Sequence, residues 1–502
     1  MGFLLGYDVG SSSVKASLIE IETSRSIATA ACPEKELSII AHKSGWAEQD
    51  PQIWWDNVKS ATQQIKSETG ISGDEIKAVG ISYQMHGLVV VDQQQEVLRP
   101  AIIWCDSRAV QIGEKAAAAL GEEVCLKSLL NLPGNFTASK LKWVMENEPD
   151  IYSRIYKIML PGDYIAMKMT ERIATTPSGL SEGIMWDYQR HCLCELIMDY
   201  YGFSRELIAE VVPTFCVQGE LTKQAAKELG LKAGTVVSYR AGDQPNNALS
   251  LNVLNPGEIA ATAGTSGVVY GVTDKADYDD KSRVNTFVHV NYTKEMPRYG
   301  VLLCLNGTGI LNSWLRKNVA GELTYDQMNE LALKATAGCE GLVILPYGNG
   351  AERTLENKDI GALIKGLNFN VHSKAHLLRA AQEGIVFALN YGLEIMRGME
   401  VEIKTIRAGN TNMFLSSLFG EVFATVSEAA IELYDTDGSK GAAIGAGIGA
   451  GIYKDAQDAF VNFKPIKSIE PNKSLTQTYI DAYKRWKEFL EHELEKGKKN
   501  GN

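Results

Sequence analysis

The fold can be inferred from residues 3–21, which read FLLGYDVGSSSVKASLIEI. Two apolar runs flank a turn of one glycine and three serines, so the pattern predicts two antiparallel strands joined by a tight turn. A third strand is expected at residues 26–31. An amphipathic helix should follow from Pro51 to about Thr69, because Asp50 can cap it and proline is favoured in the first helical turn. Further strands are then expected, at residues 76–83 and 88–91. This succession of strands and helices predicts an α/β fold.

A comparable pattern begins again in the second half of the chain. An apolar strand at residues 257–263 should end in a turn at Gly264-Thr265-Ser266-Gly267 and resume at 268–272. The later elements expected are a strand at 405–408 and helices at 376–398, 413–434, 442–453 and 474–496. Turn-forming residues cluster at 244–247 and 255–257, which places a joint near 245–256. We therefore expect an N-terminal domain of residues 1–247 and a C-terminal domain of residues 248–502.

Length and charge exclude several classes of protein. The 502 residues exceed what one hydrophobic core normally holds, which agrees with two domains. A net charge of −11 without a basic block argues against nucleic acid or anionic lipid as a partner. No run of about 20 apolar residues exists to span a membrane. The N-terminus lacks the basic region of a signal peptide, and the eight cysteines include no CxxC pair, so we expect a cytoplasmic protein.

The two glycine-rich turns have the chemistry of a phosphate-binding site. In the first, Gly10 and Ser11–Ser13 offer backbone N–H groups and hydroxyls to an anion, and Lys15 lies just beyond them. Asp8, at the end of the preceding strand, has the carboxylate that Mg²⁺ prefers. The turn at Gly264–Gly267 has similar groups without the acid. Each turn is equally compatible with an ordinary hairpin, but one such turn in each half favours a phosphate clamp between two domains.

Two further segments carry side chains suited to a small-molecule site. Asp243 follows the apolar run at residues 235–238, where it can act as a general base facing a cleft or simply cap the next helix. Met85 and His86 lie between two expected strands, where they can contact a sugar or serve the core. The residues alone leave both alternatives open.

Taken together with further blocks, these segments make the sequence resemble the FGGY family of carbohydrate kinases over about residues 3–455. The blocks that carry the resemblance are YDVGSSS (7–13), QMHG (84–87), WCDSR (104–108), NFTASKLKW (135–143), GD (242–243), AGTSG (263–267), GAERT (350–354) and GALIKGL (361–367). Within the family, the Met-His pair makes the chain most similar to the kinases of D-xylulose.

The resemblance implies a fold of two ribonuclease-H-like, actin-like ATPase domains with ATP and sugar meeting in the cleft between them. It implies that Asp243 is the catalytic base and that Asp8 organises Mg²⁺, through water, and the transferring phosphate. It places the sugar at Met85, His86, Asp243 and Gln244. The implied ATP-binding residues are Ser11, Ser12, Ser13, Lys15, Gly264, Thr265, Ser266, Gly309, Gly409, Asn410 and Asn412.

The activity implied is ATP-dependent phosphorylation of D-xylulose to D-xylulose 5-phosphate. Gln244 departs from the Asn usual among the xylulose kinases, so L-ribulose, gluconate, L-fuculose and glycerol remain alternative acceptors. An actin-like ATPase without a sugar acceptor, or a non-catalytic sugar sensor, would not require Asp8, Asp243 and the Met-His pair together. Because members of the family often form dimers, we expect that this chain forms a homodimer.

Overall fold

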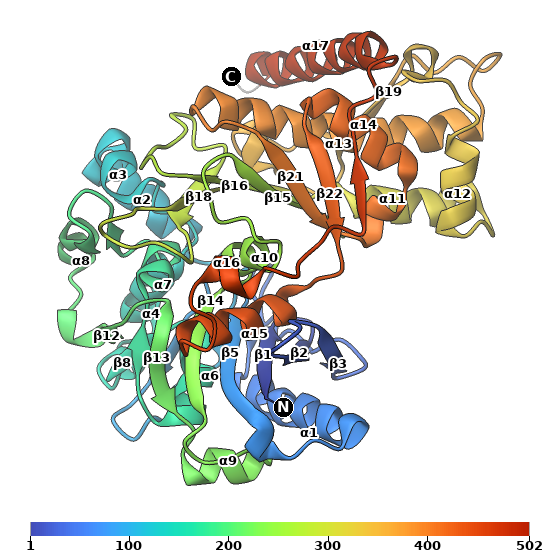
Figure 1. Ribbon diagram of the computed structural model, residues 1–502. Helices are drawn as coiled ribbons and strands as arrows, with labels where there is room; N and C mark the ends of the chain where they lie inside the picture. Colours follow the sequence, from blue (N-terminus) through green and yellow to red (C-terminus); the bar gives the residue numbers. More distant parts are fainter. Residues whose placement is uncertain (1, 501–502) are drawn as a thin grey trace.

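The computed structural model describes residues 2–500 and contains two large β-sheets, one in each half of the molecule (Figure 1). The first sheet has six strands in the order β13-β14-β5-β1-β2-β3. Its strands are β1 (Phe3–Val9), β2 (Val14–Glu20), β3 (Ser26–Cys32), β5 (Ile76–Tyr83), β13 (Phe215–Glu220) and β14 (Val236–Gly242). Strands β1, β2 and β3 form an antiparallel meander, and β5 and β14 run parallel to β1. The strands expected at 3–8, 14–21 and 26–31 are confirmed.

The second sheet has seven strands in the order β17-β18-β16-β15-β21-β22-β23. These are β15 (Glu258–Ala263), β16 (Gly267–Thr273), β17 (Asn285–Val288), β18 (Tyr299–Leu305), β21 (Thr405–Gly409), β22 (Ala430–Tyr434) and β23 (Lys467–Ile469). Strands β15, β16 and β18 are antiparallel, and β21 and β22 run parallel to β15. The two sheets therefore repeat one strand arrangement. The α/β fold of two actin-like domains is confirmed.

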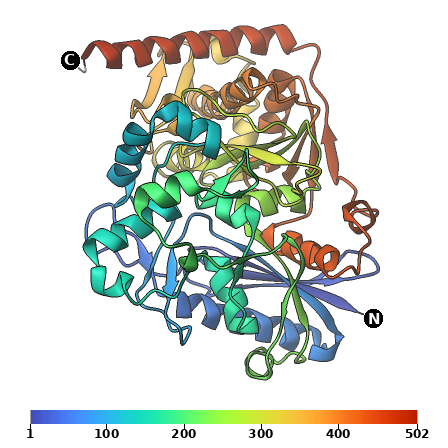
Figure 2. The same cartoon turned by 90° about the vertical axis from the view of Figure 1, so that its left-hand side faces the viewer.

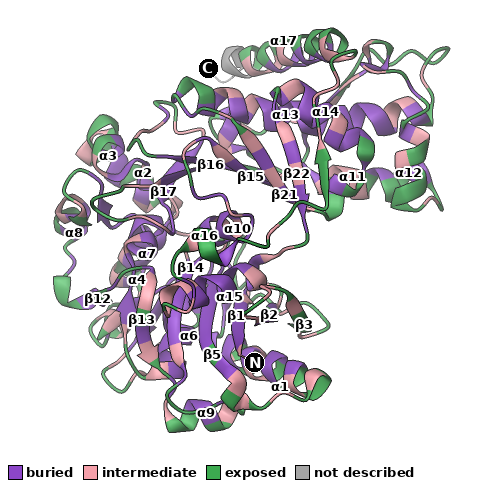
Figure 3. Ribbon diagram, viewed as in Figure 1, coloured by how far each residue is buried: buried purple, intermediate pink, exposed green. Residues whose placement is uncertain are grey.

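Helices cover both sheets, whose strands are largely buried (Figure 3). In the first half they are α1 (Pro51–Thr69), α2 (Val110–Leu120), α3 (Glu122–Leu129), α4 (Thr137–Asn147), α5 (Pro149–Tyr152), α6 (Pro161–Thr170), α7 (Pro177–Glu182), α8 (Glu195–Tyr201), α9 (Lys223–Leu229) and α10 (Asp243–Ser250). In the second half they are α11 (Gly309–Leu315), α12 (Tyr325–Ala332), α13 (Lys374–Gly398), α14 (Ser417–Ser427), α15 (Gly438–Gly449), α16 (Ala456–Ala459) and α17 (Thr476–Asn500). Helix α17 lies on the second sheet's side of the molecule, far from the first sheet (Figure 2).

Short two-stranded ladders complete the fold. They are β4 (Glu48–Gln49) with β7 (Ala101–Ile102), β6 (Val89–Val91) with β8 (Lys157–Met159), β9 (Ala174–Thr175) with β12 (Glu210–Val211), β10 (Trp186–Asp187) with β11 (Cys192–Leu193), and β19 (Val343–Tyr347) with β20 (Gly361–Lys365).

Helix α15 belongs to the second half of the sequence but packs on the first sheet, against β1, β5 and β14. Its backbone approaches the strands very closely. A Cβ added at Gly6 would lie 2.1 Å from the carbonyl oxygen of Ser439, and one at Gly80 would lie 2.0 Å from that of Ala442. Only glycine fits such contacts. The small residues of α15 therefore serve close packing of the helix on the sheet.

Two predictions about secondary structure are wrong. The single helix predicted at 413–434 is interrupted, because α14 ends at Ser427, Glu428 adopts a left-handed φ of 58°, and β22 begins at Ala430. The turn predicted at 244–247 is the first part of α10, which begins directly after β14. Proline in a first helical turn is favourable, so Pro245 is compatible with that helix. The domain boundary at 247/248 stays a prediction.

All eight cysteines are free thiols. Within residues 2–500, no helix is both long and apolar enough to cross a membrane.

Candidate active site

The carboxyl ends of β1, β5 and β14 bring three of the predicted segments together. These strands are parallel, and Tyr83 at the end of β5 is in register with both Val9 and Gly242. Parallel strands present their carboxyl ends at one edge of a sheet, which is where α/β proteins place ligands. Asp8, the Met85-His86 pair and Asp243 therefore lie along the same edge.

Asp8 is held at the end of β1 by contacts on several sides. Its Oδ1 accepts a 2.8 Å hydrogen bond from Ser82 Oγ, and Lys15 is its cross-strand neighbour on β2. A Cβ added at Gly438, the first residue of α15, would lie 2.5 Å from Asp8 Oδ2. Burial raises the pKa of Asp8, Ser82 and Lys15 oppose that shift, and the negative charge of Asp437 adds to it.

Asp243 is the first residue of α10 and has a strongly shifted acidity. Burial, followed by the negative charge of Asp8, raises its pKa to about 7, while hydrogen bonds from Gln244 oppose the shift. A carboxylate with a pKa near neutrality can both accept and release a proton under ordinary conditions. Gln244, predicted to touch the sugar, lies beside it on α10.

His86 is a neutral imidazole in a left-handed turn after β5, with φ of 62°. Its Nδ1 lies 2.9 Å from the backbone carbonyl of Glu182, so Nδ1 carries the proton and Nε2 is left as an acceptor. Burial and the positive charges of Lys140 and Arg353 lower the pKa of His86 to about 3, against the opposing effect of its hydrogen bond to Glu182. The ring packs edge-on against Phe136 at a centroid distance of 4.9 Å.

Glu182 is a buried carboxyl at this edge that sequence reasoning missed. Its side chain accepts hydrogen bonds from Tyr83 Oη at 2.6 Å and from the backbone N–H of His86 at 3.1 Å. Burial raises its pKa well above the ordinary value, with Asp243 among the negative neighbours that add to the shift. A Cβ at Gly242 would lie 3.2 Å from Glu182 Oε2 and 2.6 Å from Met85 Cγ. Glu182 and Met85 therefore flank the approach to Asp243.

Lys140, within the family-like block at 135–143, was likewise not predicted as a site residue. Its fully buried ammonium donates to the carbonyls of His86 at 2.8 Å and Ile103 at 3.0 Å. Burial lowers its pKa to about 7, although Asp106 and Cys105 oppose the shift. Its two hydrogen bonds tie the His86 turn to the segment before Trp104, and so fix the position of the imidazole.

The first glycine-rich turn is compact and anchored. Gly10 N donates to the carbonyl of Ser13 at 3.0 Å, and the side chain of Gln49 donates to the carbonyl of Ser11 at 2.7 Å. Trp104 Nε1 donates to Ser11 Oγ at 3.3 Å. Ser12 and Lys15 are exposed, so their polar groups are accessible to a ligand.

Groups of the second half of the chain cover this edge near His86. Phe287 on β17 packs on His86 at a centroid distance of 5.5 Å. Cys304 on β18 has its pKa raised to about 11 by burial and by the charges of Glu352 and Asp243. Burial lowers the pKa of Arg353, whose positive charge acts on both His86 and Cys304. The Asp243 edge thus faces a wall built by the other half of the molecule.

The second glycine-rich turn belongs to a separate cavity of about 480 Å³. Gly309 N donates to the carbonyl of Gly264 at 2.9 Å, and Ile310 N donates to that of Thr265 at 3.2 Å, which joins the turn to the start of α11. The predicted residues that line the cavity are Gly264, Thr265, Gly309 and Asn412. Ser266 and Asn410 are next to lining residues in the chain, and Gly409 is two residues from Thr411, but none of the three lines the cavity. The remaining wall comes from α11, α12 and residues 411–416, with Ala263 at the end of β15.

The groups around Asp8 fit a magnesium ion. Mg²⁺ takes one or two carboxylates and keeps several waters, so it needs no cage of protein ligands. Asp8 supplies one carboxylate, and Asp437 lies near enough to raise the pKa of Asp8. Among the described residues there is no group of three or more His, Cys, Asp or Glu that could hold a metal alone.

Two family models match the chain in sequence. The N-terminal domain of the FGGY family of carbohydrate kinases matches residues 3–250, and the C-terminal domain matches residues 259–446. The chain therefore belongs to the FGGY family of carbohydrate kinases. It is a sugar kinase, which transfers a phosphoryl group to a carbohydrate.

Individual relatives cover nearly the whole chain. The xylulose kinase of Bacillus subtilis (strain 168) is 26% identical over 98% of this chain and 97% of its own length, and that of Escherichia coli (strain K12) is 28% identical over 93% of each. Three similar solved structures each cover 98% of both chains. They are a xylulose kinase from Rhodospirillum rubrum (24% identity, TM-score 0.88), a gluconate kinase from Lactobacillus acidophilus (22%, 0.87) and a Plasmodium falciparum glycerol kinase with ADP (19%, 0.88).

Proposed function

We propose that the protein phosphorylates a ketopentose, D-xylulose, at the expense of ATP, and releases D-xylulose 5-phosphate and ADP. The observation that carries this proposal is the grouping of Asp243, with its pKa of about 7, beside Met85 and the neutral His86 at the edge of the first sheet. The curated relatives described above are named xylulose kinases, which supports the choice of sugar.

Asp243 is proposed to accept the proton of the sugar hydroxyl as that oxygen attacks the terminal phosphate. Phosphoryl transfer depends mainly on alignment and charge neutralisation, so the base orients the hydroxyl and removes its proton late. The raised pKa suits this role, because a base works best when its pKa lies near the working pH. Near neutral pH both the ionised and the protonated forms of Asp243 are therefore accessible in the free enzyme.

Asp8 is proposed to hold Mg²⁺ through water. When bound, the ion neutralises charge on the phosphate oxygens. The contribution of the chain itself is to fix the carboxylate: Ser82 donates to one oxygen, and the missing side chain of Gly438 leaves room for the other.

The sugar is proposed to lie between Met85, His86, Asp243 and Gln244. The Nε2 atom of His86 accepts a hydrogen bond from a sugar hydroxyl, since Nδ1 is already used on the carbonyl of Glu182. The ring stays neutral down to a pH of about 3, which keeps Nε2 an acceptor under all working conditions. Lys140 holds the His86 turn in place through its carbonyl.

ATP is proposed to lie with its phosphates between the two glycine-rich turns and its adenosine part in the cavity of about 480 Å³. The phosphate-binding residues are Ser11, Ser12, Ser13, Lys15, Gly264, Thr265 and Ser266, and the adenosine side is formed by Gly309, Gly409, Asn410 and Asn412. Closure of the two halves then excludes water, which competes with the sugar as an acceptor. The homodimer and the cytoplasmic location stay predictions.

Other acceptors for the same chemistry are the main alternative. A gluconate kinase and a glycerol kinase have nearly the same fold as this chain, and their identities of 22% and 19% say nothing about its substrate. Gln244, in place of Asn, lies at the position where the sugar is expected, so a changed acceptor preference would arise there.

A panel of acceptors tests the proposal. ADP release is measured with pentuloses, including D-xylulose and L-ribulose, with L-fuculose, and with glycerol and gluconate, against a control without acceptor. D-xylulose should give the highest kcat/KM. If another acceptor exceeds it, the choice of sugar is wrong, and if no acceptor raises ADP release, the proposed site is wrong.

A further inference from the structure

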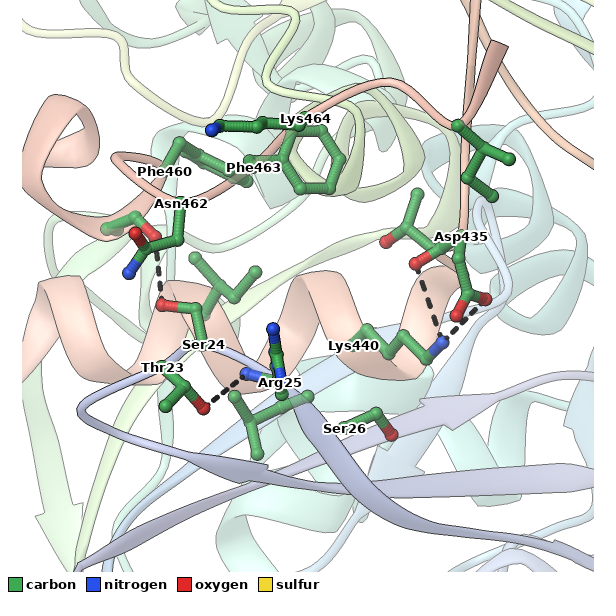
Figure 4. A pocket seen from close by; sticks show the side chains of 15 residues that line it. Thr23, Ser24, Arg25, Ser26, Asp435, Lys440, Phe460, Asn462, Phe463 and Lys464 are labelled. Carbon is green, nitrogen blue, oxygen red and sulfur yellow. Dashed lines mark hydrogen bonds and ion pairs between the residues drawn. The ribbon is translucent and has the colours of Figure 1, made fainter.

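A cavity of about 740 Å³ lies outside the proposed sugar and nucleotide sites, between the β2–β3 hairpin, α15 and the segment after α16 (Figure 4). It shares no lining residue with the cavity of about 480 Å³. Two chain segments that connect α15 to the second sheet contribute to its wall. Residues 435–437 lead from β22 into α15, and residues 460–466 lead back toward β23.

The walls of this cavity are held by hydrogen bonds and ring stacking. Ser24 Oγ in the hairpin donates to the carbonyl of Ala459 at 3.1 Å, and Tyr453 Oη donates to the carbonyl of Ile21 at 2.9 Å. Phe463 stacks on Tyr434, with ring centroids 4.3 Å apart and planes 3° from parallel. The cavity is therefore preformed, as ligand pockets usually are.

Two cations at the cavity have no acidic partner. Arg25 extends from the hairpin, and Lys464 lies on the opposite wall (Figure 4). Within the described part of the chain, neither side chain forms an ion pair or a hydrogen bond. The third cation, Lys440, is compensated, because its Nζ lies 3.0 Å from Asp435 Oδ1. The cavity thus has two positive charges available to an anion.

Two hydroxyl groups at the same cavity are buried and unpartnered. Ser26 Oγ, at the start of β3, and Thr436 Oγ1, in the segment that leads into α15, have no hydrogen-bond partner. Buried polar atoms almost always have one, so a pair of exceptions at one cavity calls for a ligand or water there. The Thr436 hydroxyl, in the wall that faces the free cations, is suited to an oxygen of an anion, whereas Ser26 lies away from Lys464 (Figure 4).

We propose that this cavity binds a small phosphate monoester. Arg25 and Lys464 meet the phosphate, to which guanidinium groups bind through paired hydrogen bonds, and Thr436 donates to one of its remaining oxygens. The apolar part of the wall, which includes Ile19, Ile444 and Phe460, contacts the carbon skeleton. A volume of about 740 Å³ is far more than phosphate alone requires, so the ester binds more tightly than inorganic phosphate. The proposal is independent of the acceptor sugar.

Calorimetric titration tests the proposal with inorganic phosphate, glycerol 3-phosphate, ribose 5-phosphate and AMP as probes. The double variant R25Q/K464Q is compared with the wild type and with R190Q/K232Q, a control that removes two exposed cations from other surfaces. At least one ester should bind to the wild type and the control. R25Q/K464Q should bind it about a hundredfold more weakly, since each charge-assisted contact is worth roughly tenfold.

Three results would overturn the proposal. The first is that no ester binds to the wild type, and the second is that R25Q/K464Q binds it as tightly as the control does, which would place it in the kinase site. The third is that chloride at matched ionic strength abolishes the binding, which would show diffuse attraction only.

The conservative variant T436V tests the Thr436 hydroxyl, and S26A, at the other unpartnered hydroxyl, is its control. T436V should weaken ester binding several-fold without a change in kinase turnover, and S26A should leave the affinity unchanged. Unchanged affinity in T436V would contradict the role of Thr436 as a donor. These experiments measure ester binding and not kinase activity. A negative result would therefore not contradict the proposed function, and a negative acceptor panel would not contradict this site.

Discussion

The edges of the two sheets differ in chemistry although their strands are arranged alike. Each sheet has three antiparallel strands followed by two strands parallel to the first. The first edge gathers titratable side chains, namely Asp8, His86, Glu182 and Asp243, all with shifted pKa values. The second edge borders a cavity of about 480 Å³ to which its turns contribute backbone amides and uncharged side chains.

The comparison shows that the same strand arrangement can support two different functions when the segments that connect the strands differ. Burial of several carboxyls at one edge raises their pKa values, which suits proton transfer. Amide and hydroxyl dipoles at the other edge suit the binding of phosphate and adenosine without proton transfer. In the proposed function, the acid–base chemistry lies on the first sheet and the adenosine contacts lie on the second, with one phosphate-binding turn on each.

The largest expected effect comes from the base at the first edge. Asp243→Asn should lower kcat for the sugar by roughly 10²–10⁴-fold, because the amide cannot accept the proton. The affinity for ATP, measured by calorimetry, should change little, since the cavity at the second edge is untouched. Sugar-dependent ADP release at the wild-type rate would remove Asp243 from its proposed role.

The second-largest effect on kcat is expected at Gly438, whose missing side chain leaves space for the Asp8 carboxylate. In Gly438→Ala the new Cβ would lie 2.5 Å from Asp8 Oδ2, so the carboxylate must move. A displacement of about 1 Å at a reacting centre can lower the rate by about 10²-fold. We therefore expect kcat to fall by up to about 10²-fold, and the Mg²⁺ concentration that gives half-maximal activity to change. Gly398→Ala is the matched control, because its Cβ would meet no atom within 4 Å. Equal kcat and Mg²⁺ titrations for the two variants would contradict this account of Asp8.

A smaller effect is expected at the second edge. The Cβ of Gly309→Ala would lie 2.2 Å from the carbonyl oxygen of Gly264, which forces the turn away from α11. The KM for ATP should rise about tenfold, equivalent to about 1.4 kcal/mol, while sugar affinity stays constant. Gly264→Ala meets no atom within 3.6 Å and should have a weaker effect. A rise in the KM for sugar instead would refute the division of tasks.

The smallest effect is expected at Glu182. Burial raises its pKa well above the ordinary value, which favours the neutral carboxyl, and a neutral carboxyl resembles an amide. Glu182→Gln should therefore change the KM for sugar less than threefold, an amount under about 1 kcal/mol. Glu182→Leu should raise it more, since Tyr83 and the His86 N–H lose their acceptor. A large effect of the Gln variant would show that Glu182 works as an anion.

The sequence predicted the strand ends that form the sheet edges, but it did not predict all of the side chains that lie there. Asp8 and Asp243 could be located because each follows an apolar run that predicts a strand, and strand ends are set locally. Glu182 and Lys140 could not, because they reach the His86 turn from helices about 50 to 100 residues away in the chain. Only tertiary packing brings them there. The helix predicted at 413–434 failed because Glu428 adopts a left-handed conformation, which residue type alone does not indicate.

The most direct test of the central claim is the pH dependence of kcat/KM for the sugar, which reports groups of the free enzyme. Asp243 must be ionised to accept a proton, and its pKa in the folded protein is about 7. The rate constant should therefore be constant above that pH and fall tenfold per pH unit below it, with no contribution from His86 until pH about 3. A profile that stays flat through pH 7 down to the ordinary range of a carboxyl group would contradict the account.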